Sequence, residues 1–319
     1  MNAVDLSAIA VVGPTASGKT KTAIMLCEHI GGEVISVDSM QVYREADIGT
    51  AKPTAEERAR IPHHLVDFLP LSREYSAADY GEDAFAAASE IASRGKIPVF
   101  AGGTGLYLEA ARTGRHDAAP DTKNDELRQR LLAIAETEDG KELLFQRLCA
   151  EDPETAEKTH KNNIRRVIRA LEIREVTGIP KSEWDKRSKM QPPRISMQVF
   201  LLDFCDRELL YHRIEKRVEE MLESGLIEEA ERLYRSGVFN ENATVSQAIG
   251  YKELIPFIEG KSSLEDAVSA LKTATRRYAK RQLTWFHAVP DIRTVYMDKD
   301  GAMRDDDAVL AEILNQIKN

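Results

Sequence analysis

The sequence predicts an α/β fold, in which a parallel sheet is flanked by helices and a helical domain is inserted between two of the strands. Short runs rich in β-branched residues alternate with helical patterns from the N-terminus to about residue 115. Strand signals then disappear until about residue 194, and a β-rich run returns at 195–203. We therefore expect a core of residues 1–115 and 195–319 and an insertion of residues 116–194.

Composition and cysteine spacing narrow the class of protein. The chain has 319 residues, of which 42% are hydrophobic and 30% charged, enough to bury a full core in more than one unit. Cys27, Cys149 and Cys205 lie far apart without C-x-x-C spacing, which argues against a disulfide framework or a zinc site and fits a cytoplasmic setting. No apolar run approaches ~18 residues and no basic segment precedes the first one, so we expect neither a membrane span nor a signal peptide.

The first predicted strand runs directly into a glycine-rich loop. Residues 8–12 are apolar and β-forming, residues 13–20 match G-x-x-x-x-G-K-[ST], and apolar residues at helical spacing follow. In this pattern backbone N–H groups turn toward phosphate oxygens, the lysine adds a positive charge and the last hydroxyl binds Mg²⁺. We therefore expect a P-loop NTPase-like core with Thr20 as a Mg²⁺ ligand. The expected phosphate site consists of Gly13, Pro14, Thr15, Ala16, Ser17, Gly18, Lys19 and Thr20.

Two later strands end in residues that could carry chemistry. The strand after the first helix ends in Asp38, which could act as a general base, bind Mg²⁺ or only cap the following turn. A further strand leads into a second glycine-rich turn that contains Thr104. Both are site candidates, because open α/β sheets bind ligands at the carboxyl ends of their strands. Arg213 and Arg217 share one helix face and could neutralise a pyrophosphate, although most such arginines are solvated.

The other predicted elements are mainly helices. One covers 76–94 and stops at Gly95, another follows Asp206 and ends at Gly225, and more helices are expected up to the C-terminus. The insertion is expected to hold helices over 122–136, 139–150, 153–159 and 162–177. The pair His63-His64 has no third ligand nearby in the sequence, so we interpret it as structural.

Two helical segments carry basic clusters in a chain whose net charge is −9. The overall charge alone argues against a nucleic-acid partner. The cluster at 161–169 flanks an apolar face, and the cluster at 272–281 flanks an apolar stripe that includes Tyr278 and Gln282. Either cluster could be a solvated face, and contact with a phosphate backbone is the alternative.

Several of these motifs, in this order, resemble the tRNA dimethylallyltransferase family, also called tRNA isopentenyltransferases. The matching segments are 13–20, 38–44, 102–107, 165–172, 217–222 and 248–253. The resemblance spans most of the chain. Eukaryotic members carry a C-terminal zinc finger that this sequence lacks, so we expect the compact bacterial type.

This resemblance implies transfer of a dimethylallyl group from dimethylallyl diphosphate to N6 of the adenosine on the 3′ side of the anticodon in tRNA, with release of pyrophosphate. It implies that the P-loop holds the prenyl diphosphate rather than ATP, and that Lys19, Arg217 and Thr20 with Mg²⁺ stabilise the leaving group. Asp38 would accept the N6 proton and Thr104 would help to place the amine. The protein is then expected to be a cytoplasmic monomer that binds the tRNA anticodon stem-loop and no membrane.

The resemblance also implies which residues contact tRNA. They come from the turn after the second strand, the glycine-rich turn, the helical insertion and two C-terminal segments. They are Asp38, Ser39, Met40, Gln41, Thr104, Asn162, Asn163, Ile164, Arg165, Arg166, Gln247, Gly250, Arg276, Arg277, Lys280 and Arg281.

Three alternatives stay open. The chain could be a kinase that uses ATP, in which Asp38 activates a hydroxyl. It could be a P-loop RNA-binding module without catalysis. It could also be an adenylate isopentenyltransferase that acts on free nucleotides, although a free nucleotide needs no basic helical insertion.

Overall fold

The computed structural model describes residues 6–114, 124–190, 192–242 and 244–317. The chain forms two compact units. The core unit comprises Met1–Gly114 and Arg194–Asn319, and the insertion unit comprises Arg115–Pro193. Each unit has a hydrophobic core of its own.

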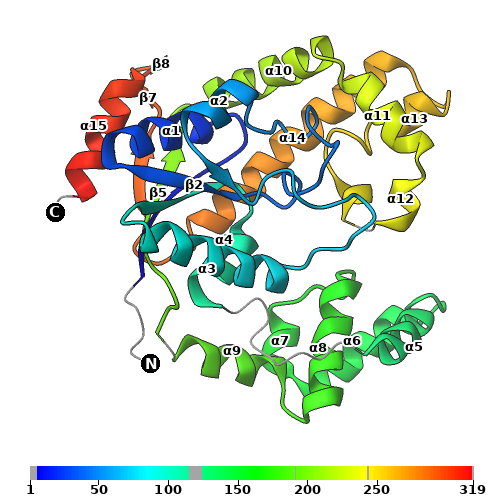
Figure 1. Cartoon of the computed structure of the whole chain (residues 1–319). Coiled ribbons are helices and arrows are strands. Elements are labelled where there is room, and N and C mark those ends of the chain that lie inside the picture. The colour runs from blue at the N-terminus through cyan, green and yellow to red at the C-terminus, as the bar shows by residue number, and fades with distance from the viewer. Residues whose placement is uncertain (1–5, 115–123, 191, 243, 318–319) are drawn as a thin grey trace. The chain divides into compact units, whose positions relative to one another are not determined.

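The core unit contains a six-stranded parallel sheet in the order β3-β2-β4-β1-β5-β6 (Figure 1). Val12 at the end of β1 pairs with Gly102 of β4 and Leu201 of β5, and Gly102 also pairs with Val37 of β2. The carboxyl ends of these four strands therefore meet at one edge of the sheet. The strands are β1 (Ser7–Val12), β2 (Gly32–Val37), β3 (His63–His64), β4 (Ile97–Gly102), β5 (Ser196–Asp203) and β6 (Arg293–Tyr296).

Burial explains why the central strands read as continuous apolar runs. Val11, Ile35, Phe100 and Phe200 lie on the four central strands and are fully buried. Parallel strands that are covered on both faces are expected to have this composition. The predicted α/β fold with a parallel sheet is confirmed.

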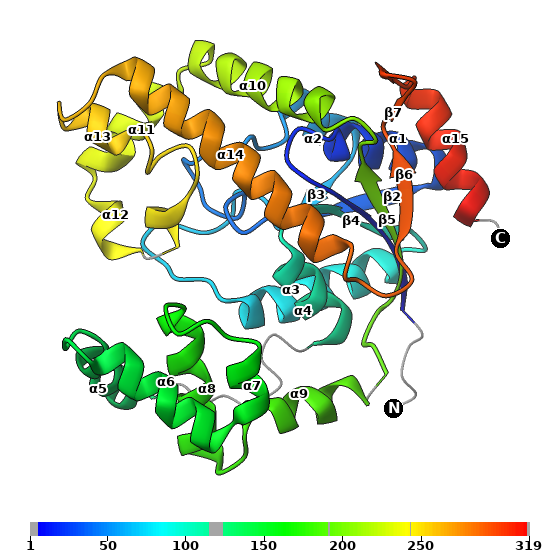
Figure 2. The ribbon, with the colours of Figure 1, turned by 180° about the vertical axis from the view of Figure 1, so that it is seen from behind.

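Helices cover both faces of the sheet. The helices α1 (Lys19–Ile30) and α15 (Asp306–Ile317) contact each other on one face, and α3 (Ala77–Ser93) and α4 (Gly105–Thr113) contact each other on the opposite face (Figures 1 and 2). Ser76 and Asp79 form a capping box at the start of α3, which explains why this helix begins where the sequence predicts.

A second group of helices connects β5 to β6. In this group α14 packs along α10 and reaches α4 (Figure 2). Ion pairs join α14 to α10, since Arg276 pairs with Glu215 and Lys272 with Glu219. The helices are α10 (Arg207–Glu223), α11 (Leu226–Arg235), α12 (Val238–Glu241), a 3₁₀ turn (Val245–Gln247), α13 (Ile255–Ile258) and α14 (Leu264–Phe286), while α2 (Ala55–Arg60) precedes β3.

The described part of the insertion unit is helical. Leu131, Leu148 and Leu171 are fully buried in its core, and the buried carboxylate of Glu172 accepts two hydrogen bonds from the Arg128 guanidinium, at 2.7 and 2.9 Å. Among all helices of the described residues, none is long and apolar enough to cross a membrane. The insertion helices are α5 (Asp125–Ala135), α6 (Gly140–Glu151), α7 (Pro153–Glu157), α8 (Ile164–Thr177) and α9 (Lys181–Lys189).

Some predicted elements were wrong. The expectation of further helices up to the C-terminus did not include β6 or the antiparallel hairpin of β7 (Asp298–Lys299) and β8 (Ala302–Met303). These strands are too short to show a clear hydrophobic period in the sequence, and β6 is a strand because it pairs with β5. The helix α9 was also missed, and the helix expected over 153–159 ends at residue 157. The expected start of the insertion, residues 116–123, lies outside the described residues.

Candidate functional site

The phosphate loop has the backbone conformation that its glycines allow. Gly18 has φ 92° and caps the start of α1, and Ala16 has φ 63°. A Cβ atom on Gly13 would lie 2.6 Å from the carbonyl oxygen of Leu202, so a larger residue would push the loop away from β5. The hydroxyl of Ser17 is buried and has no hydrogen-bond partner among the described residues. A phosphate oxygen at the loop would satisfy this hydroxyl.

Lys19 lies at the first position of α1 with its side chain folded over the loop. Its Nζ donates a hydrogen bond to the carbonyl oxygen of Pro14 at 2.6 Å. Burial and the nearby Arg217 guanidinium lower the pKa of Lys19 to about 7, although the Asp38 carboxylate acts in the opposite direction. The surroundings of the loop therefore destabilise the positive charge of this lysine.

Asp38 follows β2 directly, and its negative charge interacts with the ammonium group of Lys19. Its Oδ1 accepts hydrogen bonds from the backbone N–H groups of Met40 at 2.9 Å and Gln41 at 3.4 Å. Asp38 therefore caps the turn, as the simpler interpretation expects. Burial nevertheless raises the pKa of Asp38 above its ordinary value, against the two N–H groups and the cations Lys19 and Arg217. A carboxylate with a raised pKa is a better proton acceptor.

Arg217 reaches the same site from α10. Burial lowers the pKa of Arg217, and the charge of Asp38 opposes this shift. Lys19, Asp38 and Arg217 thus lie close enough to shift one another's pKa values, although they come from three distant segments. One turn earlier on α10, the Nε of Arg213 donates a hydrogen bond to the carbonyl oxygen of Ala16 at 2.8 Å.

The second glycine-rich turn lies against the Asp38 turn. The Oγ1 of Thr104 accepts a hydrogen bond from the N–H of Ser39 at 3.2 Å, and the N–H groups of Gly103 and Thr104 both donate to the carbonyl oxygen of Val37. A Cβ atom on Gly102 would lie 2.1 Å from that oxygen, so close contact of the two strand ends requires glycine there. Thr104 is therefore held beside the Asp38 turn.

Two residues of α14 that are not among the sequence-predicted site residues complete this site. The pKa of the Tyr278 hydroxyl is raised by burial and by the charge of Asp38, while hydrogen bonds with Thr104 and Gln282 oppose the shift. The buried amide of Gln282 accepts from the N–H of Thr15 and donates to the carbonyl oxygen of Gly103, both at 2.9 Å. A polar amide within the apolar stripe of a helix was the available signal.

The side chain of Gln41 makes hydrogen bonds within the protein. Its Oε1 accepts from the Ser36 hydroxyl at 2.9 Å, and its Nε2 donates to the carbonyl oxygens of Thr50 and Ala51. The segment 47–49 that leads to these carbonyls is held by a buried carboxylate, Glu229 of α11. Gln41 therefore supports the shape of the turn, while Ser39 and Met40 are half-buried beside it.

The C-terminal tRNA-binding candidates differ in how free their charges are. Arg276 is half-buried and paired with Glu215, whereas Arg277, Lys280 and Arg281 are exposed. The exposed three are therefore better placed to meet phosphates than Arg276, which the prediction included on equal terms. Gln247 ends the 3₁₀ turn that precedes Gly250, and the N–H of Gly250 donates to Glu253.

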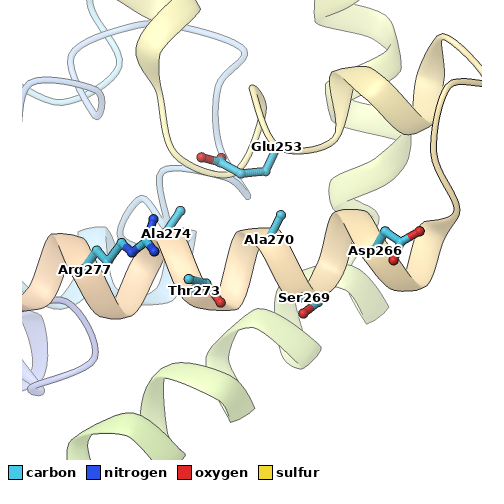
Figure 3. Close-up of a pocket in the computed structure, with 7 residues that line it drawn as sticks. All are labelled: Glu253, Asp266, Ser269, Ala270, Thr273, Ala274 and Arg277. Carbon is cyan, nitrogen blue, oxygen red and sulfur yellow. The ribbon is translucent and has the colours of Figure 1, made fainter.

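A groove of about 510 Å³ lies between α14 and the segment that follows Gly250 (Figure 3). Glu253 lines one side of this groove, and Arg277 lies on the α14 side. Its full lining is Glu253, Asp266, Ser269, Ala270, Thr273, Ala274 and Arg277.

The insertion candidates gather at the start of α8. Asn162, Asn163, Arg165 and Arg166 are exposed, and Ile164 is half-buried against the core of the insertion unit. The N-terminus of a helix carries partial positive charge and unpaired N–H groups, so this end favours an anion. The arrangement is chemically suited to phosphate contacts.

The described residues contain no group of three or more His, Cys, Asp or Glu side chains that could hold a metal ion. His64 of β3 instead pairs with the buried Glu33, with 2.8 Å between Nε2 and Oε2. Thr20 could contribute a hydroxyl to Mg²⁺, whose other ligands would be phosphate oxygens and water, a ligand set typical of this ion.

Two family models match the sequence. The model described as IPP transferase covers residues 41–289, and the model described as isopentenyl transferase covers residues 6–73. A tRNA dimethylallyltransferase of Thermoanaerobacter sp. is 43% identical over 291 residues, 91% of either chain. A tRNA dimethylallyltransferase of Geobacillus kaustophilus is 47% identical over 278 residues, 86% of either chain.

Solved structures agree with these matches. The full-length tRNA isopentenylpyrophosphate transferase of Bacillus halodurans is 42% identical, with a TM-score of 0.70 over 98% of this chain and 96% of that one. A eukaryotic dimethylallyltransferase acting on tRNA is 34% identical, with a TM-score of 0.78 over 91% of this chain and 73% of that one.

Proposed function

The chain belongs to the tRNA dimethylallyltransferase family, and from this membership we propose that it transfers the dimethylallyl group of dimethylallyl diphosphate to N6 of the adenosine 3′-adjacent to the tRNA anticodon. The observation that carries the proposal is the convergence of three charged side chains at one end of the sheet. Lys19, Asp38 and Arg217 supply two cations for a leaving diphosphate and one base for an incoming amine.

On the donor side, the bond between carbon and the bridging oxygen breaks, and pyrophosphate leaves with the electron pair. The N–H groups of the phosphate loop, Lys19 and Arg217 stabilise the negative charge that develops on it. The unpartnered Ser17 hydroxyl supports an anion at this place. Mg²⁺, held by Thr20 together with diphosphate oxygens, would add a Lewis acid to the same group.

On the acceptor side, N6 of adenine attacks the allylic carbon and loses a proton. The lone pair of this amine is delocalised into the ring, so removal of its proton as the new bond forms lowers the barrier. Asp38 is the proton acceptor, and its raised pKa suits this role. Thr104, beside the Asp38 turn, orients the amine.

The acceptor adenosine has to leave its stack to reach this site, as for other enzymes that modify a base. The exposed cations at the start of α8 and along α14 supply phosphate contacts that hold the anticodon stem-loop during this step. We also propose that the enzyme works as a monomer in the cytoplasm; the free thiols at Cys27, Cys149 and Cys205 are in keeping with a reducing compartment.

The test is a transfer assay with radiolabelled dimethylallyl diphosphate and unmodified tRNA. Nucleoside digestion should yield labelled N6-isopentenyladenosine, and Lys19→Ala should lower the rate by about 10²–10³-fold, the usual cost of one lost contact to developing charge. A Lys21→Ala control removes an exposed lysine of α1 that pairs with Asp306, and should keep the wild-type rate.

Parallel arms separate the alternatives. AMP in place of tRNA tests for an adenylate isopentenyltransferase, and ATP with tRNA tests for a kinase. Labelled product from AMP at the tRNA rate, or ATP hydrolysis without prenyl transfer, would overturn the proposal. Binding of tRNA without any transfer would reduce the protein to an RNA-binding module.

A further inference from the structure

Gln282 links the two glycine-rich loops of the site. It lies near the end of α14 and is 5% exposed. Its Oε1 accepts a hydrogen bond from the N–H of Thr15 in the phosphate loop, and its Nε2 donates to the carbonyl oxygen of Gly103. The two loops are far apart in the sequence, and one amide bonds to both.

The fit around this amide is tight. A Cβ atom on Gly103 would lie 2.0 Å from the Nε2 of Gln282, so the side chain reaches the backbone only because residue 103 is glycine. An amide can accept and donate at the same time, which neither a carboxylate nor an aliphatic side chain can do. The residue type and the close approach both match a bridge between an N–H group and a carbonyl group.

The bridge lies next to groups that act in the reaction. Thr15 is four residues before Lys19, and Gly103 precedes Thr104. Tyr278, one helical turn before Gln282, hydrogen bonds with Thr104 and is close enough to Asp38 for its pKa to respond. The end of α14 therefore contacts the donor loop and the acceptor turn together.

We propose that Gln282 is a positioning residue that holds the phosphate loop and the Thr104 turn at the separation required for transfer. This inference rests on the proposed function, because that function assigns the donor to one loop and the acceptor amine to the other. In this assignment Gln282 acts through the backbone groups of Thr15 and Gly103. It acts by keeping the reacting carbon and N6 in line, where a misplacement of about 1 Å can cost about 10²-fold in rate.

Two variants of the full-length enzyme test the bridge. Gln282→Met keeps the side-chain length and loses both hydrogen bonds, whereas Gln282→Glu keeps the acceptor for Thr15 and loses the donor to Gly103. Thr275→Val is the matched control, since Thr275 is half-buried on α14 and its hydroxyl donates only to the carbonyl oxygen of Leu271 in the same helix.

We expect single-turnover transfer at saturating substrates to fall about 10–100-fold in Gln282→Met and at least about tenfold in Gln282→Glu. The affinity for tRNA should stay within about twofold of wild type, and Thr275→Val should keep the wild-type rate. Thermal unfolding of each variant confirms that the protein compared is folded. A wild-type rate in either Gln282 variant would overturn the inference, because each lacks the bridge.

A double-mutant cycle with Thr104→Val distinguishes positioning from general support of the fold. If Gln282 acts through the Thr104 turn, the double variant should be less than about threefold slower than the slower single variant. Rate losses that multiply would show that Gln282 acts independently of Thr104 and would overturn the inference. The proposed function fails separately, if the wild-type enzyme forms no isopentenyladenosine in tRNA.

Discussion

Replacement of Glu229 by glutamine should destabilise the segment 47–49 more than any surface substitution nearby. The carboxylate of Glu229 is 3% exposed. Its Oε2 accepts from the N–H groups of Asp47 and Ile48, both at 3.0 Å, and its Oε1 accepts from the N–H of Gly49 at 2.9 Å and the Tyr251 hydroxyl at 2.7 Å. All four hydrogen-bond partners are donors, and a nitrogen of the Arg232 guanidinium lies 4.0 Å from Oε2, so the ionised carboxylate is matched to its surroundings.

The magnitude follows from this count of donors. A glutamine keeps one acceptor oxygen and turns an NH₂ group toward two donors, so two hydrogen bonds to a charged group are lost. Each is worth about 1.5–3 kcal/mol, and the relief of burying a charge offsets part of the loss. We expect the free energy of unfolding of the core unit to fall by about 3 kcal/mol. Tyr251→Phe, which removes one donor, should cost about 2 kcal/mol.

Urea unfolding and amide hydrogen exchange measure this effect. Exchange within the segment 47–49 should accelerate in Glu229→Gln, because the N–H groups that face the NH₂ group of the glutamine lose their acceptor. Glu231→Gln is the matched control on α11. Among the described residues its partly exposed carboxylate pairs with Arg235, and this pair should contribute under about 1 kcal/mol. A loss of stability below about 1 kcal/mol in Glu229→Gln, with unchanged exchange at 47–49, would refute the reasoning.

Three further predictions concern the reaction. Burial lowers the pKa of Lys19 to about 7, and only its ammonium form attracts an anion, so the affinity for pyrophosphate should fall about tenfold per pH unit above about 8. Calorimetry would detect proton uptake on binding, and an affinity that is flat up to about pH 9 would contradict this prediction. Asp38→Asn should slow single-turnover transfer about 10²–10⁴-fold with tRNA affinity unchanged, and a parallel collapse of filter binding would make Asp38 a binding residue. Replacement of Arg277, Lys280 and Arg281 by glutamate should weaken tRNA binding and reduce the slope of log K against log salt by about 0.7–0.9 per lost phosphate contact. The affinity for pyrophosphate should not change, and an unchanged slope would mean that this helix face is only solvated.

The sequence by itself determined the four central strands of the sheet and the phosphate loop. Both depend on local patterns, since each of these strands is a short contiguous apolar run and the phosphate loop is a contiguous motif of eight residues. The placement of Asp38 and Thr104 also followed from the sequence, because Asp38 comes directly after β2, Thr104 lies two residues after β4, and parallel strands end at one edge. Short elements such as β6 and α9 could not be predicted from the sequence, since each has too few residues to show a clear hydrophobic pattern.

Only the tertiary structure decided which side chains meet across long separations in the chain. Gln282 bridges Thr15 and Gly103, and Glu229 holds the segment 47–49, yet a single amide or carboxylate on a helix carries no sign of its partner. The same is true of Arg276, which the sequence predicts as a cation for tRNA and which pairs with Glu215 in the fold. Hydrogen bonds and ion pairs of this kind depend on distance in space, and that distance exists only after the sheet and its covering helices have packed.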